Sequence, residues 1–237
     1  MKFEHELFHG TLLKRYKRFL ADVKLDGGKI VTAHCANSGS MLTLKDEGNE
    51  VWLSPAANPK AKLDYKWEIV KANNAMVGIN TSLPNKLVEE AILDGTIAEL
   101  GGYENLRREM KYGKNSRIDL FLSGSTVGNP DCYVEVKSVT LSRETGVGEF
   151  PDAVTSRGTK HLNELKQMVD NGNRSVMLYL AQRADIEKFK IASDIDPTYA
   201  DALKVALDGG VEAYCYICSV TPTGIQVDHS IPILDVK

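Results

Sequence analysis

Alternating apolar and polar positions run through the first eighty residues. The apolar positions are rich in β-branched and aromatic residues and are separated by turn-forming residues, which predicts short strands. Asp26-Gly27-Gly28 predicts a hairpin turn, because glycine adopts positive φ without steric cost. Such a pattern favours a small barrel, and on periodicity alone an OB-fold and an SH3-like barrel fit nearly equally. The predicted strands span residues 3–14, 19–25, 29–35, 50–54 and 67–71.

The pattern changes at Asn80-Thr81-Ser82-Leu83-Pro84-Asn85. A residue before proline avoids the helical region, whereas proline itself favours the first turn of a helix. The helix predicted next spans residues 87–93, and Gly95 ends it. We therefore expect a first domain over residues 1–82 and a second over residues 83–237.

Helical periodicity alternates with strand patterns in the second half. Leu162, Leu165, Met168 and Val169 recur at helical spacing, and Gly172 follows them. Strands that alternate with helices along the chain predict a mixed α/β domain. The predicted strands span residues 97–99, 107–112, 117–122, 132–141, 175–182, 210–220 and 224–227, and the predicted helices span 159–171 and 199–208.

The composition is that of a soluble globular protein, with 43% apolar and 26% charged residues among 237. No apolar run approaches the roughly 18 residues that a membrane span needs, so we expect no membrane partner. The N-terminal MKFEHELFHG has no apolar signal-peptide core, which makes a cytoplasmic location the default expectation.

Cysteine usage agrees with that location. Cys35, Cys132, Cys215 and Cys218 are too few and too scattered for a disulfide framework. Cys215 and Cys218 form a C-x-x-C pair, which can bind zinc or support redox chemistry. Because the pair lies in the apolar run 211–220 without a second pair, we expect two buried or half-buried strand thiols instead.

The two predicted domains differ in charge. Residues 1–80 hold 12 Lys and Arg against 9 Asp and Glu, a balance of +3, whereas the remainder holds 17 against 23, a balance of −6. The whole-chain charge of −3 disfavours a protein that coats DNA indiscriminately. The asymmetry predicts that one part contacts phosphate and that the other gathers carboxylates for a different purpose.

Three charged residues of the second domain form the candidate catalytic site. In the segment YVEVKS, the alternation of a strand places Glu135 and Lys137 on one face. A hairpin through residues 124–129 would bring Asp119 of the segment SRIDLFL beside them. This D…E-x-K arrangement is that of restriction-type nucleases, and the alternative is a solvated strand face with one Glu–Lys pair.

The candidate site also predicts a metal ion. Two close carboxylates repel each other, and a hard divalent cation relieves the repulsion through oxygen ligation. Asp119 and Glu135 are thus candidate ligands of Mg²⁺ or Mn²⁺, with Lys137 placed to orient a water or to stabilise developing charge. Glu89 and Glu90 project to different sides of their predicted helix, so at most one reaches the site. We take Glu90 as the candidate third ligand, with a helix-surface acid as the alternative.

Basic residues gather in two segments that are candidates for nucleic-acid contacts. One segment begins the predicted helix at 159–171, where Thr155 or Thr159 can act as the cap and where phosphate binds favourably. The other, residues 14–19, interleaves four cations with the two aromatic residues Tyr16 and Phe19, and such a ring can stack on a base. In both cases solvated surface charge is the alternative. The candidate contacts in these segments are Lys14, Arg15, Tyr16, Lys17, Arg18, Arg157, Lys160 and His161, and Arg117, outside both segments, is a further candidate.

Six ordered segments closely resemble one known family, the sugar fermentation stimulation protein A family. The resemblance implies an N-terminal OB-like barrel, a C-terminal PD-(D/E)xK restriction-endonuclease-like domain, and DNA as the partner. It also implies that Asp119, Glu135 and Lys137 are the nuclease-type triad. The segments are residues 10–23 (GTLLKRYKRFLADV), 32–41 (TAHCANSGSM), 77–88 (VGINTSLPNKLV), 111–119 (KYGKNSRID), 133–141 (YVEVKSVTL) and 150–162 (FPDAVTSRGTKHL).

Together these inferences favour a DNA-binding protein with a metal-dependent phosphodiesterase site, which the family links to the regulation of sugar metabolism. The alternative is a non-catalytic DNA-binding transcriptional regulator that uses a nuclease fold as a scaffold, because fold does not determine function. A third interpretation is an RNA or nucleotide processor. The sequence leaves the oligomeric state open, a homodimer included.

Overall fold

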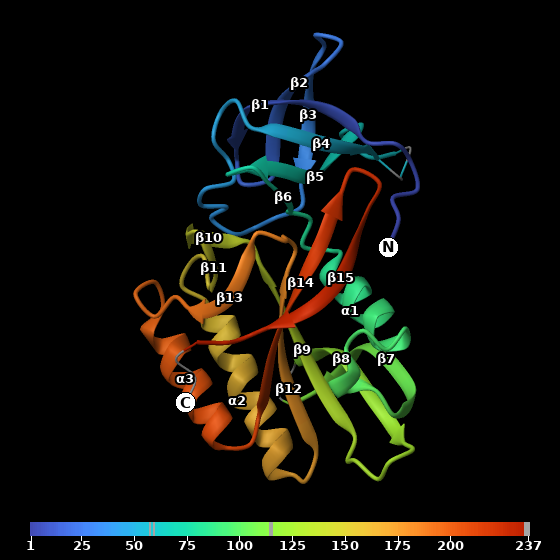
Figure 1. The fold of residues 1–237 in the computed structure, drawn as a ribbon, viewed down its shortest axis with the longest axis vertical. Helices are drawn as coiled ribbons and strands as arrows, with labels where there is room; N and C mark the ends of the chain where they lie inside the picture. The colour runs from blue at the N-terminus through green and yellow to red at the C-terminus, as the bar shows by residue number, and fades with distance from the viewer. Residues whose placement is uncertain (57, 59, 114–115, 235–237) are drawn as a thin grey trace.

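The N-terminal strands form a closed barrel, at the top of Figure 1. The computed structural model describes residues 1–56, 58, 60–113 and 116–234. The barrel strands are β1 (Phe8–Tyr16), β2 (Leu20–Leu25), β3 (Ile30–Cys35), β4 (Glu50–Pro55), β5 (Tyr65–Ala72) and β6 (Ala75–Gly78). Their order is β3-β2-β1-β4-β5-β6, and parallel pairing of β3 with β5 closes the barrel that the strand pattern predicts.

Alternate side chains of these strands fill the barrel. Leu12, Val23, Leu53 and Trp67 have no exposed area. Because successive residues of a strand face opposite sides, the intervening residues form the outer surface. The short β6 was not predicted. It follows a tight turn at Asn73-Asn74, where both residues adopt positive φ, 51° and 65°.

The segment before β1 leaves the barrel, which corrects the strand predicted at 3–14. The strand begins only at Phe8. Upstream, Lys2 pairs with Gly224, and Leu7 packs into the core of the second domain. The apolar residues of this segment therefore cover a different core from the one that their periodicity indicated.

The second domain is a mixed α/β fold, in the lower part of Figure 1. Its large sheet has the order β15-β14-β12-β9-β8-β7, and a small sheet has the order β10-β11-β13. The elements are α1 (Pro84–Leu93), η1 (Ala98–Leu100), β7 (Tyr103–Tyr112), β8 (Ser116–Ser125), β9 (Cys132–Val139), β10 (Leu141–Glu144), β11 (Gly146–Phe150), α2 (Ser156–Asp170), β12 (Arg174–Ala181), β13 (Ile186–Ile191), α3 (Pro197–Asp208), β14 (Glu212–Thr221) and β15 (Gly224–Ile231).

Helices cover both faces of the large sheet. Val88 of α1 belongs to the same buried cluster as Val134 of β9. Leu162 of α2 and Leu203 of α3 belong to a second cluster with Tyr179 of β12. Since β9 alternates, Val134 faces α1 and Glu135 faces the side covered by α2. This layering places the middle of β9 between a hydrophobic layer and the start of α2.

Three local predictions differ from the structure. The strand predicted at 97–99 is the short helix η1, and the strand predicted at 132–141 is interrupted after Val139. Strands β11 and β13 were missed, because glycines and charges weaken their alternation. Of the two candidate caps for α2, Thr155 accepts a hydrogen bond from the Gly158 N–H at 3.1 Å.

The C-x-x-C pair consists of buried thiols, as expected. Cys215 and Cys218 lie on β14 and belong to the two opposite hydrophobic clusters. Burial raises the pKa of each thiol, which disfavours the thiolate that metal binding requires. In the described part of the chain, no helix is long and apolar enough to cross a membrane.

The barrel contacts the second domain through the loop at residues 37–41. The Ser40 hydroxyl donates to the backbone oxygen of Asp152 at 2.9 Å, and the Met41 N–H donates to the Asp152 carboxylate at 3.2 Å. A Cβ at Gly39 would lie 2.6 Å from the same carboxylate, so a side chain there would push the loop away. On the other side, the Gly78 N–H donates to the Gln182 backbone oxygen at 2.8 Å.

Candidate functional site

The candidate site lies where β8 and β9 separate. Their antiparallel pairing ends at the residue next to Asp119. Beyond that point, Asp119 Oδ2 accepts a hydrogen bond from the backbone N–H of Val136 at 2.8 Å. The structure thus brings Asp119 beside the strand segment that carries Glu135 and Lys137.

Glu135 is almost completely enclosed, with 2% of its area exposed. Its Oε1 accepts a hydrogen bond from Lys137 Nζ at 2.7 Å and also contacts His161 Nδ1. Its Oε2 is buried and has no hydrogen-bond partner among the described residues. A buried polar atom without a partner costs about 1–3 kcal/mol of folding free energy. Such an atom indicates a role other than packing.

The charge of Glu135 affects the ionisation of Asp119. Burial, followed by the negative charge of Glu135, raises the pKa of Asp119. Burial by itself also raises the pKa of Glu135, but the hydrogen bond to His161 and the charge of Lys137 outweigh it and hold this pKa below its usual value. A raised pKa beside a second carboxylate is the condition that a bound divalent cation relieves.

Asp119 and Glu135 fit a hard divalent cation by the chemistry of their donor atoms. Both offer carboxylate oxygens, and Glu135 Oε2 has no competing hydrogen bond among the described residues. Within residues 1–56, 58, 60–113 and 116–234, no group of three or more His, Cys, Asp or Glu side chains is placed to hold a metal ion. A cation at this pair would therefore take its other ligands from water and substrate, as Mg²⁺ commonly does.

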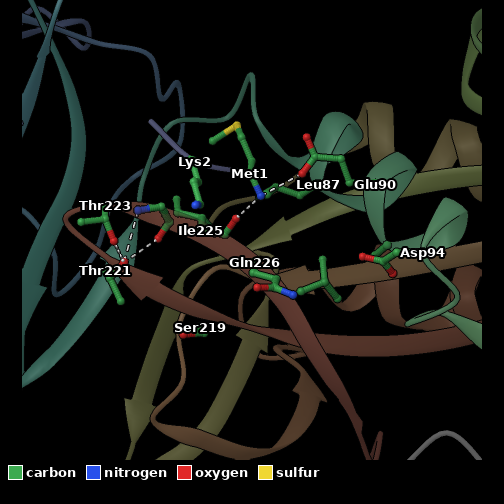
Figure 2. A pocket seen from close by; sticks show the side chains of 13 residues that line it. Met1, Lys2, Leu87, Glu90, Asp94, Ser219, Thr221, Thr223, Ile225 and Gln226 are labelled. Carbon is green, nitrogen blue, oxygen red and sulfur yellow. Dashed lines mark hydrogen bonds and ion pairs between the residues drawn. The ribbon is translucent and has the colours of Figure 1, made fainter. Parts of the chain in front are cut away.

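Glu90, the candidate third ligand, is not brought to this pair. Its carboxylate lies 2.8 Å from the N-terminal ammonium of Met1. It lines a cavity of about 460 Å³ beside α1 and β15, together with Leu87 (Figure 2). Glu89 pairs instead with Arg108 at 3.3 Å. Glu90 lies away from the pair because the first turn of α1, and not its middle, approaches the carboxylates.

Asn85 is the residue that α1 contributes to the site, and sequence reasoning missed it. Its Nδ2 donates a hydrogen bond to Asp119 Oδ1 at 2.9 Å. With the Val136 N–H on the other oxygen, Asp119 is oriented from two sides. Asn85 is uncharged, so a search for charged residues does not find it. The sequence feature that could have indicated it is its position in the segment 77–88, which resembles the family.

The basic residues near the start of α2 have different surroundings. His161 is 4% exposed and lies against Glu135, so it is a partner of the carboxylate and not a surface contact for phosphate. Arg157 is exposed, and its Nε donates to His161 Nε2 at 3.4 Å. Lys160 is half exposed and donates to a serine hydroxyl at the start of β8 at 2.9 Å. Arg117 is exposed on β8.

Arg15, in the basic run of the barrel, is half-buried and bonds to the backbone of a neighbouring loop. Its guanidinium donates to the backbone oxygens of Asn37 and Gly39 at 2.9 and 3.1 Å. It therefore supports the loop that contacts the second domain. Its expected contact with nucleic acid stays a prediction, because a basic run in the sequence does not show where each side chain points.

The rest of that run lies at the barrel surface. Tyr16 Oη donates to the Asp22 carboxylate at 3.0 Å, and Lys14 Nζ lies 3.5 Å from the same carboxylate. Lys17 and Arg18 are exposed in the β1–β2 turn, with φ of 46° and 63°. The exposed cations of this region are thus Lys14, Lys17 and Arg18.

Comparison with protein-family models agrees with this architecture. Residues 13–79 match the model described as the SfsA N-terminal OB domain. Residues 82–224 match the model described as the sugar fermentation stimulation protein RE domain. The OB-like assignment of the barrel is thereby confirmed over the SH3-like alternative.

Individual relatives carry the same description. A sugar fermentation stimulation protein homolog from Rhodospirillum rubrum is 53% identical over 99% of each chain. Another, from Paramagnetospirillum magneticum, is 55% identical and covers 96% of this chain and 95% of the relative. The structure of Pyrococcus furiosus SfsA in complex with Ca²⁺ matches with a TM-score of 0.88 at 27% identity, covering 98% of this chain and 97% of that chain. The chain belongs to the sugar fermentation stimulation protein (SfsA) family.

Proposed function

We propose that the protein binds DNA and carries a metal-dependent phosphodiesterase site formed by Asp119, Glu135 and Lys137. The observation that carries this proposal is the buried, unpartnered Oε2 of Glu135 beside a second carboxylate. Buried polar atoms are usually hydrogen-bonded, so an unpartnered carboxylate oxygen beside a second carboxylate is available to a ligand. The description of the matching domain as an RE domain and the Ca²⁺ complex of the Pyrococcus furiosus protein support the proposal.

Each residue has a distinct part in this proposal. Asp119 and Glu135 would hold Mg²⁺ or Mn²⁺ through their carboxylate oxygens. Such an ion supplies polarisation of the phosphodiester and a lower pKa for water. The Lys137 ammonium lies 2.7 Å from Glu135 and its side chain is 14% exposed, so it can stabilise negative charge on a phosphate. His161 fixes the orientation of Glu135.

DNA binding is proposed for the exposed cations of both domains. Lys17 and Arg18 lie in the barrel turn, and Arg157 lies near the start of α2. Arginine pairs with phosphate through two parallel hydrogen bonds, and lysine pairs with it as a point charge. Contacts of this kind position a nucleic acid without reading its sequence.

The alternative is a DNA-binding regulator in which the same fold is a scaffold without catalysis. It agrees equally with the family's link to sugar fermentation. The juxtaposition of Asp119, Glu135 and Lys137, with Glu135 Oε2 available as a ligand, favours the catalytic proposal.

Incubation of the full chain with labelled single- and double-stranded DNA, in Mg²⁺, Mn²⁺ or EDTA, separates the two proposals. We expect cleavage that requires the metal and that is lost in Glu135→Ala. The matched control is Glu187→Ala, which removes an exposed carboxylate on β13 and should cleave normally. Binding without cleavage in every condition would establish the regulator, and preferential cleavage of RNA would establish an RNA processor.

A further inference from the structure

A row of neighbouring side chains crosses the outer face of the barrel. Tyr16 of β1 is the register partner of Leu20 of β2, which is the partner of His34 of β3. His34 is in turn the partner of Lys66 of β5. Because register partners project from the same face of a sheet, these side chains form one continuous row. We call it the cross-barrel row.

Phe19 adds an exposed aromatic ring to this row. It is 43% exposed, and its ring lies 6.4 Å from that of the exposed His34 with only 27° between the planes. Phe8 differs, although it is similarly exposed at 45%. Its ring meets Tyr65 edge-on, at 5.3 Å and 88°. The near-parallel Phe19–His34 pair therefore offers ring faces on which an unpaired base can stack.

Cations lie at both ends of the cross-barrel row. Lys17 and Arg18 occupy the exposed turn next to Phe19. At the other end, the Lys66 side chain is 31% exposed. Aromatic faces between cations match the chemistry of single-stranded nucleic acid, whose bases stack while its phosphates pair with the charges.

The row leads toward the candidate catalytic site. Lys66 Nζ donates to the Ser82 hydroxyl at 3.3 Å. Ser82 lies in the segment between the barrel and α1, and Asn85 follows in the first turn of that helix. Asn85 Nδ2 donates to Asp119 Oδ1 at 2.9 Å. These hydrogen bonds thus connect the barrel face to Asp119 through a short stretch of chain.

We propose that a single-stranded DNA segment crosses the barrel on this row, stacks bases on Phe19 and His34, and continues past Ser82 to Asp119 and Glu135. The proposal rests on the proposed nuclease function and deepens it by specifying the form of the substrate. Bases in a duplex are already stacked on one another, so the row selects an unpaired strand.

Fluorescence anisotropy with labelled DNA in EDTA tests this proposal without cleavage. We expect the full chain to bind single-stranded DNA more tightly than the same sequence as a duplex. The double variant Phe19→Ala/His34→Ala should weaken single-strand binding by at least about five-fold. Phe8→Ala is the matched control and should bind as the wild type does. Phe19→Tyr keeps the ring and should retain the affinity.

The salt dependence of DNA binding tests the contribution of the cations. Lys66→Gln should reduce the slope of log K against log salt concentration by about 0.7, because one phosphate contact with a single strand is lost. A double variant that binds single strands as well as the wild type, or a wild type that prefers duplex DNA or RNA, would overturn the proposal. Normal binding without metal-dependent cleavage would refute the nuclease function while leaving the row supported. Absence of any nucleic-acid binding by the wild type would refute both.

Discussion

Glu135 and Glu149 are both buried glutamates with a cationic partner, yet their surroundings differ. Glu149 is 1% exposed, and Arg143 bonds both of its oxygens, each at 2.8 Å. Glu135 is 2% exposed, but Lys137 and His161 both contact the same oxygen, and the other has no partner among the described residues. The planar guanidinium fits a carboxylate with two parallel bonds, whereas an ammonium is a single point charge.

This difference distinguishes a structural ion pair from a candidate binding site. Arg143 also pairs with Asp194 at 2.6 Å, so both carboxylates that it contacts are hydrogen-bonded to its guanidinium. In the cluster around Glu135, burial and the charge of Glu135 raise the pKa of Asp119. The first cluster thus bonds both oxygens of its buried glutamate, whereas the second leaves Glu135 Oε2 available to a ligand.

The largest expected effect comes from removing the ammonium group of Lys137, which is the cation beside Glu135 and Asp119. Lys137→Met should lower the proposed cleavage by about 100-fold or more, because no ammonium then stabilises charge on the phosphate. Mn²⁺ affinity, measured by calorimetry, should stay the same or increase, since a competing positive charge is removed. The matched change Arg143→Met should leave cleavage per folded molecule unaltered. A loss of cleavage that is equal in both variants would contradict the comparison.

The next effect concerns the contribution of the Glu149–Arg143 pair to the free energy of unfolding. Glu149→Gln removes half of a charged, bidentate interaction at a buried position. We expect it to lower the free energy of unfolding by about 2 kcal/mol, measured by urea denaturation. Glu187→Gln, at an exposed position of β13, should change it by less than about 0.5 kcal/mol. Equal stability of the two variants would show that the Arg143 pair contributes little.

A smaller effect is expected from the residue that orients Asp119. Asn85→Ala removes the hydrogen bond to Oδ1 and should weaken Mn²⁺ binding about 10-fold, the lower end for outer-shell partners of a metal ligand. Calorimetry on the full chain measures the affinity directly. Lys86→Ala changes the exposed neighbour on the same helix and serves as the control. Unchanged affinity in Asn85→Ala would remove Asn85 from the site.

Asp119 and Glu149 should also respond to acid in opposite ways. The pKa of Asp119 is raised above the usual 3.8 by burial and by Glu135, so in the window above 3.8 the folded state binds more protons than the unfolded state. Its contribution to stability therefore falls as pH rises through this window. Burial alone raises the pKa of Glu149, but the hydrogen bonds from Arg143 outweigh it and hold this pKa below the usual 4.5. Its contribution is present above 4.5 and is lost as pH falls through the lowered pKa.

Urea denaturation in EDTA at several acidic pH values separates these contributions. Asp119→Asn should gain stability relative to the wild type as pH rises. Glu149→Gln should show a deficit that shrinks as pH falls. Parallel pH profiles for the two variants would contradict the assigned signs.

Local patterns in the sequence determined much of the architecture. The alternation of β9 put Glu135 and Lys137 on the face opposite Val134, and the structure has the same arrangement. Pro84 marked the start of α1, one turn earlier than the predicted span. These features follow from the two-residue period of a strand and from the fixed φ of proline, which act within a few residues.

The partners of the site residues were decided only by tertiary structure. Asn85 reaches Asp119 because α1 packs its first turn beside β8, and His161 reaches Glu135 because α2 covers β9. Glu90 is drawn instead to the N-terminal ammonium, from a segment that the strand pattern had assigned to the barrel. Sequence periodicity shows which face of an element a side chain occupies. Which distant element covers that face depends on how the helices, the sheet and the N-terminal segment pack together.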